Sequence, residues 1–136
     1  MSKQHEQALL FLAKARDDEA LLEEVRDSPR VPDGIFGFHA QQAAEKLLKA
    51  WLSDLGVSFP RTHNLRFLMD LLRDAGRSLP TVLADLDGLT PFATLFRYEN
   101  LPTATALDRG EVARRIRTFR EHVEQQIEAP PGQPTR

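Results

Sequence analysis

The feature that most limits how this chain can fold is the spacing of apolar residues around its central stretch, residues 38–52, FHAQQAAEKLLKAWL. These apolar residues recur in steps of three and four, the period of one face of an α-helix. They are Phe36, Ala40, Ala43, Ala44, Leu47, Leu48, Trp51, Leu52 and Leu55. Alanine in the first half lets a neighbouring helix come close, and the larger residues of the second half fill space. We therefore expect a central helix that packs on more than one side.

The segment before this stretch predicts a first helix over residues 3–26. Its expected inward stripe consists of Leu9, Leu12, Ala13, Ala20 and Leu21. Its acidic residues are expected to form a solvated face, made of Asp17, Asp18, Glu19, Glu23 and Glu24. Two prolines within residues 28–32 indicate a loop, because each disfavours helix in the residue before it. Asp33 is then the expected N-cap of the central helix.

Glycine and proline divide the next part of the chain. Gly56 is expected to end the central helix, and Gly76 to end a third helix over residues 63–75 that Thr62 caps. The inward residues of this third helix are Leu65, Leu68, Met69 and Leu72. A fourth helix is expected from Ser78, with Pro80 in its first turn. It carries Val82, Leu83, Leu86 and Leu89 and is interrupted at Pro91, before a short segment over residues 92–98.

The last helix is predicted from the pair Asp108 and Glu111, three residues apart as in a capping box. It runs to about residue 128, with Val112, Ile116, Phe119, Val123 and Ile127 inward. The sequence therefore predicts an all-α protein, an up-and-down bundle of four long helices plus a short fifth helix. We expect one domain over residues 1–129 and a disordered C-terminal tail over residues 130–136, starting at its two adjacent prolines.

Composition narrows the classes of function. The net charge of −2 provides no overall attraction to nucleic acid or to an anionic membrane. The absence of cysteine excludes disulfides and thiol catalysis. No apolar run is long enough to span a membrane, and the first residues, MSKQHEQ, lack a signal-peptide core. We therefore expect a cytoplasmic protein.

Three pieces of the sequence occur in the order typical of a known domain. The first is FHAQQAAEKLLKA at residues 38–50, the second is THNL at residues 62–65, and the third is Arg97-Tyr98 before the last helix. This order resembles the HEPN domain of prokaryotes, whose central helix reads Q-Q-A-x-E-K-x-x-K-A and is followed by a T-H-D-L-like helix start. The resemblance covers about residues 5–128.

The resemblance implies a helical bundle that forms homodimers. Many HEPN proteins are encoded beside a minimal nucleotidyltransferase, and some such pairs act as toxin and antitoxin. Catalytic members cleave RNA without a metal ion, using an Arg-x4–6-His motif near the start of the last long helix that is paired across the dimer. Other members lack the motif and bind nucleotides or partner proteins.

Comparison with the Arg-x4–6-His motif gives candidate catalytic residues in the last helix. Arg117 and His122 match its spacing, but five residues along a helix turn two side chains about 140° apart. Arg115 and His122, seven residues apart, share a face with Glu111, and histidine suits acid–base chemistry. The simpler interpretation makes His122 a boundary residue near a subunit contact. Arg97, Arg115 and His122 are the catalytic candidates.

The stretch where the family places its motif reads RYENLPT, residues 97–103, and no histidine follows. The guanidinium of Arg97 suits a phosphate. Tyr98, the only tyrosine, is a candidate for modification by a transferred nucleotide. The alternative makes these residues a helix end and a half-buried aromatic ring.

Polar residues of the central helix are candidates to line a groove between helices or subunits, on the strength of the resemblance. They are Gln41, Gln42, Glu45, Lys46 and Lys49, with His63 at the following helix start. The alternative is a solvated face with a Glu45–Lys49 pair, and a His63 ring that accepts from a backbone N–H. The four histidines lack metal-ligand spacing, so we expect neither a metal site nor a cofactor.

The leading interpretation is a non-catalytic or weakly active HEPN module, dimeric, that acts with a nucleotidyltransferase as half of a toxin–antitoxin pair. The alternatives are a metal-independent ribonuclease and a stand-alone nucleotide-binding module. Nucleotide or RNA is the expected ligand class, and no membrane partner is expected.

Overall fold

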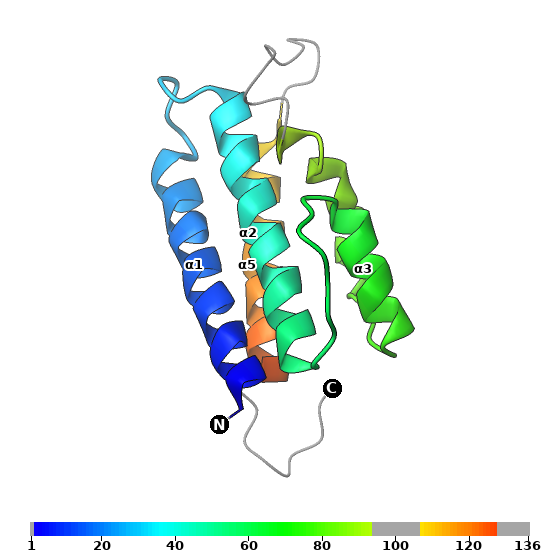
Figure 1. The fold of residues 1–136 in the computed structure, drawn as a ribbon. Coiled ribbons are helices and arrows are strands. Elements are labelled where there is room, and N and C mark those ends of the chain that lie inside the picture. Colours follow the sequence, from blue (N-terminus) through cyan, green and yellow to red (C-terminus); the bar gives the residue numbers. More distant parts are fainter. Residues whose placement is uncertain (1, 94–106, 128–136) are drawn as a thin grey trace.

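The computed structural model describes residues 2–93 and 107–127, and every element in these ranges is helical. Three long α-helices, α1 (Lys3–Val25), α2 (Asp33–Asp54) and α5 (Arg109–Ile127), pack side by side (Figure 1). A shorter helix, α3 (Leu65–Asp74), and the 3-10 helix η2 (Leu86–Leu89) pack against the remaining side of α2, whereas a second 3-10 helix, η1 (Thr81–Leu83), contacts α5. Within the described ranges, none of the helices has the length and apolarity needed to cross a membrane.

Helix α2 is the centre of the fold, as its apolar spacing predicts. It packs against α1, α5 and α3. Each position of its predicted apolar face is buried except Leu55, at the end of the helix, which is partly buried. Trp51 is 1% exposed. The prediction of a helix that packs on more than one side is therefore confirmed.

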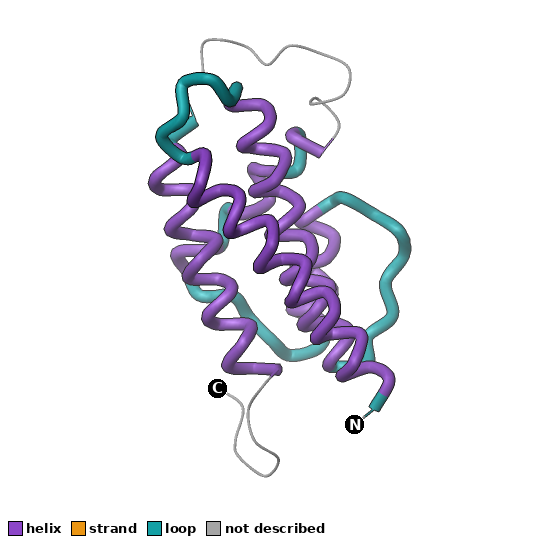
Figure 2. The backbone as a smooth tube through the Cα atoms, turned by 90° about the vertical axis from the view of Figure 1, so that its left-hand side faces the viewer, coloured by secondary structure: helices purple, strands orange, loops and turns teal. Residues whose placement is uncertain are grey.

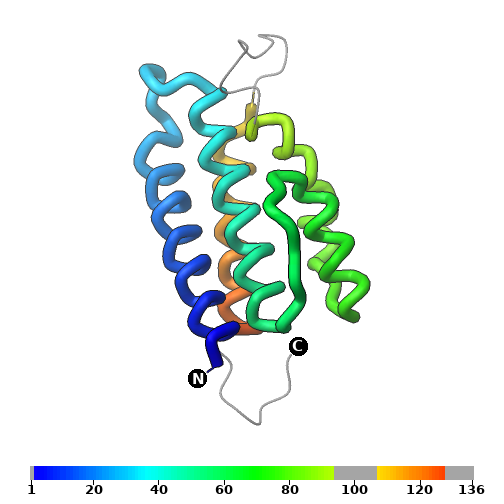
Figure 3. Tube along the Cα trace, viewed as in Figure 1, coloured from blue at the N-terminus to red at the C-terminus, as the bar shows by residue number. Residues whose placement is uncertain are grey.

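The order of helix directions differs from the expected up-and-down bundle. The connector between α2 and α3, residues 55–64, runs back along α2, so α3 then follows the same direction as α2 (Figures 1 and 3). Ten extended residues span about 30 Å, close to the length of α2 itself. Turned by 90°, the connector stands beside the helices as a long loop (Figure 2). An up-and-down bundle instead requires a short connector here, after which the chain reverses its direction.

The prediction of a fourth long helix starting at Ser78 is wrong, because this segment forms η1 and η2 instead. Its buried leucines, Leu83, Leu86 and Leu89, follow one another at intervals of three residues, the period of a 3-10 helix. Val82, expected inside, is 45% exposed. Of the short helical segment expected over residues 92–98, only Phe92 and Ala93 lie within the described residues, and both are helical.

The buried face of α1 also differs from the predicted one. Its apolar core residues are Ala8, Leu12, Ala15 and Leu22, so only Leu12 of the expected stripe is buried. Asp18 and Glu19, expected in solvent, are buried because basic residues of neighbouring helices neutralise them. Lys46 Nζ donates to Asp18 Oδ2 at 2.6 Å, and Arg120 Nε donates to Glu19 Oε1 at 2.8 Å.

Helix ends follow the predicted chemistry with two changes. Gly56 and Gly76 have φ of 74° and 81°, the left-handed backbone that ends a helix. Asn64, not Thr62, caps α3, since its Oδ1 accepts from Phe67 N at 3.1 Å. Asp33 is the first residue of α2 rather than its N-cap.

The carboxylate of Asp33 is instead part of a cross-link at one end of the bundle. Arg109 Nε donates to Asp33 Oδ1 at 2.8 Å. The same guanidinium donates to the carbonyl oxygens of Val25, Ser28 and Val31 at 3.1, 3.2 and 2.5 Å. One side chain thus ties the first residue of α5 to the end of α1 and the start of α2.

Candidate functional site

Most of the polar residues predicted to line a groove come together around Glu45. Its Oε1 accepts from His63 Nδ1 at 2.7 Å and from Gln41 Nε2 at 3.1 Å. Its Oε2 accepts from Lys49 Nζ at 2.9 Å. Gln42 Nε2 donates to Gln41 Oε1 at 2.7 Å, and Gln41 Nε2 also donates to the backbone carbonyl of His63 at 3.0 Å. We refer to these five side chains as the Glu45 network.

The Glu45 network is buried at its centre and exposed at one edge. Glu45 is 5% exposed, whereas the His63 side chain is 59% exposed. Burial raises the pKa of Glu45, but hydrogen bonds from His63, Lys49 and Gln41 outweigh this effect and hold that pKa below its ordinary value of 4.5. The carboxylate is therefore ionised at neutral pH. Its hydrogen bonds fasten the connector to α2 rather than leaving an empty groove.

Lys46, the remaining residue of the predicted groove, belongs to a different contact. Its Nζ pairs with Asp18 of α1, whose other oxygen accepts from His39 Nδ1 at 3.0 Å. Lys46 thus faces α1, whereas the Glu45 network faces the connector. The structure does not bring Lys46 together with the other candidates.

The arginines of α5 that were catalytic candidates are held by carboxylates. Arg117 Nη2 lies 2.9 Å from Glu23 Oε1 on α1. Arg115 donates to Glu111 Oε1 at 3.1 Å and to Asp85 Oδ1 at 2.9 Å, beside η2. Arg97 and Tyr98, the remaining candidates, lie outside the described residues.

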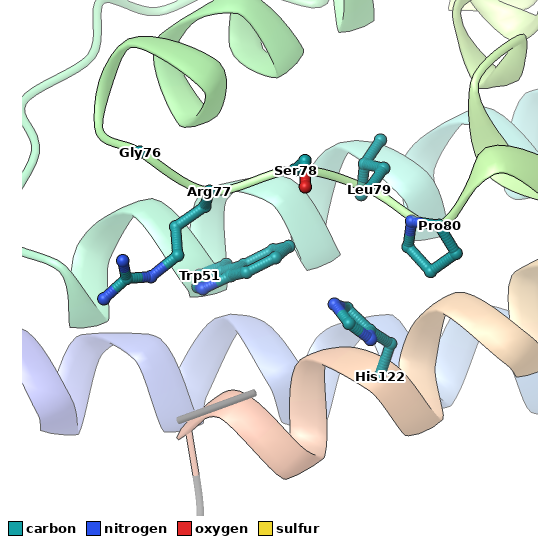
Figure 4. Close-up of a pocket in the computed structure, with 7 residues that line it drawn as sticks. All are labelled: Trp51, Gly76, Arg77, Ser78, Leu79, Pro80 and His122. Atoms are coloured by element: carbon teal, nitrogen blue, oxygen red, sulfur yellow. The ribbon is translucent and has the colours of Figure 1, made fainter. Parts of the chain in front are cut away.

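His122 lies in a cleft of about 400 Å³ between α2, the loop after α3 and α5 (Figure 4). The residues that line the cleft are Trp51, Gly76, Arg77, Ser78, Leu79, Pro80 and His122. The Trp51 and His122 rings meet edge to face, with centroids 5.2 Å apart and planes at 69°. The side chain of Arg77 extends past one end of the Trp51 indole, and His122 lies at the other end (Figure 4).

One polar atom at the cleft has no partner among the described residues. Nε2 of His122 is covered by protein and makes no hydrogen bond to the described residues. Burial lowers the pKa of His122 below its ordinary value of 6.5, so the ring is neutral at pH 7. A neutral imidazole offers one donor and one acceptor nitrogen. The cleft thus has a cation at one end and a neutral imidazole at the other.

Sequence reasoning identified His122 and placed Trp51 in the core, but it missed Arg77 and Ser78. No short motif marks these two residues, because the cleft is built from three segments far apart in the chain. Their proximity to Trp51 follows from α3 running in the same direction as α2, which the sequence did not indicate.

Comparison with known proteins gives a family match over most of the chain. The model of a family described as the HEPN domain matches residues 6–126. No curated protein and no solved structure matches the chain significantly.

Proposed function

This chain belongs to the HEPN domain family, and from this premise we propose that it is a non-catalytic or weakly active HEPN module. It acts as a homodimer together with a nucleotidyltransferase partner, and the two proteins form a toxin–antitoxin pair. HEPN domains often dimerise, which supports the homodimer. The family is frequently associated with nucleotidyltransferases, which supports a transferase as the partner protein.

One observation carries the non-catalytic part of this proposal: neither α5 arginine at the motif's spacing converges with His122, since Arg115 binds Glu111 and Asp85. Arg117 binds Glu23 of α1, whereas His122 packs against Trp51 of α2. A histidine that acts as general base must come within hydrogen-bond reach of the hydroxyl it deprotonates. The covered Nε2 of His122 does not offer that access.

A ribonuclease assay with the metal chelated separates the proposal from its enzymatic alternative. We expect no cleavage of RNA above the level of the buffer. Robust cleavage that is lost in His122→Ala, and retained in the matched variant His5→Ala, would establish the ribonuclease instead. His5 suits the control because it pairs with Asp54 outside the cleft. Circular dichroism must show that both variants are folded.

Co-expression tests the partner. The chain should co-purify with a nucleotidyltransferase encoded beside it, and sedimentation of the chain alone should give about twice its mass of 15.4 kDa. Expression of the chain alone should arrest growth, and co-expression of the transferase should relieve the arrest, as expected for a toxin–antitoxin pair.

Intact-mass measurement tests Tyr98 as the acceptor of a transferred nucleotide. The added nucleotide mass should disappear in Tyr98→Phe. An active transferase that neither binds nor modifies the chain contradicts the proposed partnership.

A further inference from the structure

We propose that the cleft between α2, the loop after α3 and α5 binds a small organic oxyanion that carries a flat ring. Its anionic group binds Arg77, and its ring lies along the cleft toward His122 and Pro80. This inference goes beyond the proposed function, because it assigns a ligand to Arg77, which neither RNA cleavage nor partner binding uses.

Arg77 provides the charge. The guanidinium groups of α5 and of α3 are occupied by carboxylates; for example, Arg120 binds Glu19 and Arg66 binds Asp87. Arg77 forms no ion pair or side-chain hydrogen bond with any residue that the structure describes, and it lines the cleft. An unused planar fork of five N–H donors matches the two oxygens of a carboxylate or phosphate. An oxyanion is therefore the group that this end of the cleft selects.

The other residues that line the cleft indicate the size and polarity of the rest of the ligand. The Ser78 hydroxyl points into the cleft over the Trp51 indole, between Arg77 and His122 (Figure 4). Leu79 and Pro80 supply apolar surface, and the volume of about 400 Å³ lies within the range of small-molecule sites, roughly 300–1,000 Å³. A single flat ring system with one anionic substituent fits these dimensions and this distribution of charge.

Nε2 of His122 is buried beside the cleft and has no hydrogen-bond partner among the described residues. A buried polar atom that lacks a hydrogen bond costs free energy, which a ligand group can recover. Among the described residues, the outer wall of the cleft, residues 77–80, is hydrogen-bonded only at its two ends. Arg77 N is fixed to Leu72 O at 2.9 Å and Leu83 N to Pro80 O at 2.8 Å, but between these points Ser78 and Leu79 take part in no hydrogen bond among the described residues.

The experiment uses the fluorescence of Trp51, which is the only tryptophan and lies in the cleft. The probes are benzoate, a carboxylate on a ring, and AMP, a phosphate monoester on a ring system. Benzamide and adenosine are their uncharged counterparts. We expect saturable binding of benzoate or AMP, supported by titration calorimetry, and binding at least about tenfold weaker for the uncharged counterparts. Preference for one anion identifies the class, carboxylate or phosphate monoester.

Variants then locate the binding. Arg77→Gln should weaken binding by about tenfold or more, and Ser78→Ala by less. Arg61→Gln is the matched control, because Arg61 is exposed, unpaired among the described residues and outside the cleft. Both arginine variants change only partly or fully exposed side chains, so the fold should persist. Absence of saturable binding up to about 10 mM, or binding that Arg77→Gln leaves unchanged, overturns the proposal.

Discussion

The Nδ1 atom of His63 lies 2.7 Å from Oε1 of the buried Glu45, across eighteen residues of sequence. An ionised carboxylate only accepts hydrogen bonds, so Nδ1 carries the proton and donates it toward Glu45. Lys49 and Gln41 bind the same carboxylate. The contact therefore fixes the end of the connector against α2, and with it the point at which α3 begins.

Replacement of Glu45 tests this role. Glu45→Gln should lower the free energy of unfolding by about 2–3 kcal/mol, because the half-buried Lys49 loses its charged partner and the amide nitrogen of glutamine cannot accept a hydrogen bond from the donor it faces. Denaturant unfolding followed by circular dichroism measures the change. Glu121→Gln is the control, since Glu121 is exposed and makes no ion pair with the described residues; it should stay within about 0.5 kcal/mol of wild type. Equal losses of stability in the two variants would contradict the role of Glu45 in fixing the connector against α2.

The central helix could be predicted because its large apolar residues and alanines recur in steps of three and four along its whole length, so the spacing identifies residues that turn inward. The first helix has apolar residues on two faces, and Leu10 and Leu21 remain exposed at 65% and 36%. Its orientation is set by ion pairs with other helices, such as Asp18 with Lys46. Such partners cannot be read from spacing within one helix.

The same distinction applies to the candidate site. Gln41, Glu45 and Lys49 are one helical turn apart, so the sequence grouped them correctly, although their burial was not evident. Arg77 and His122 meet in the cleft only because the connector runs back along α2. That path depends on tertiary contacts, including the hydrogen bond between Gln41 and the His63 carbonyl.

Trp51 should be a large contributor to stability. Trp51→Ala removes a side chain that is 1% exposed, and the resulting cavity should cost about 3–5 kcal/mol of unfolding free energy. Thermal or denaturant unfolding checks the value. Val82→Ala, at a site that is 45% exposed, should cost well under about 1 kcal/mol. A loss below about 1 kcal/mol for Trp51→Ala would mean that α2 faces the wrong way.

Arg109 should be more sensitive than other arginines of α5. Arg109→Ala breaks the cross-link to Asp33 and removes a donor from three backbone carbonyl oxygens, so we expect a loss of about 2–4 kcal/mol. Arg109→Lys should not restore stability, because an ammonium lacks the planar fork that reaches these acceptors together. Arg114→Ala is the control, since Arg114 is 61% exposed and binds only its helical neighbour Glu111; its loss should be under about 0.5 kcal/mol. Full rescue by lysine would refute the multidentate role.

His122 should make stability depend on pH in a defined direction. Burial lowers its pKa in the folded protein. Below the ordinary pKa of 6.5 the unfolded chain therefore binds a proton that the folded protein does not, so the free energy of unfolding falls as the pH falls through this window.

The variant His122→Phe removes this titration and keeps a ring against Trp51. Denaturant unfolding at about pH 7.5 and about pH 5.5 should show a larger loss of stability in wild type than in the variant. The histidines that pair with carboxylates, His5, His39 and His63, are present in both proteins and cancel in the difference. Glu45, whose pKa is lowered from 4.5, is also present in both proteins, so its effect on stability cancels in the difference. The same loss in both proteins would mean that His122 is protonated in the folded protein at about pH 5.5.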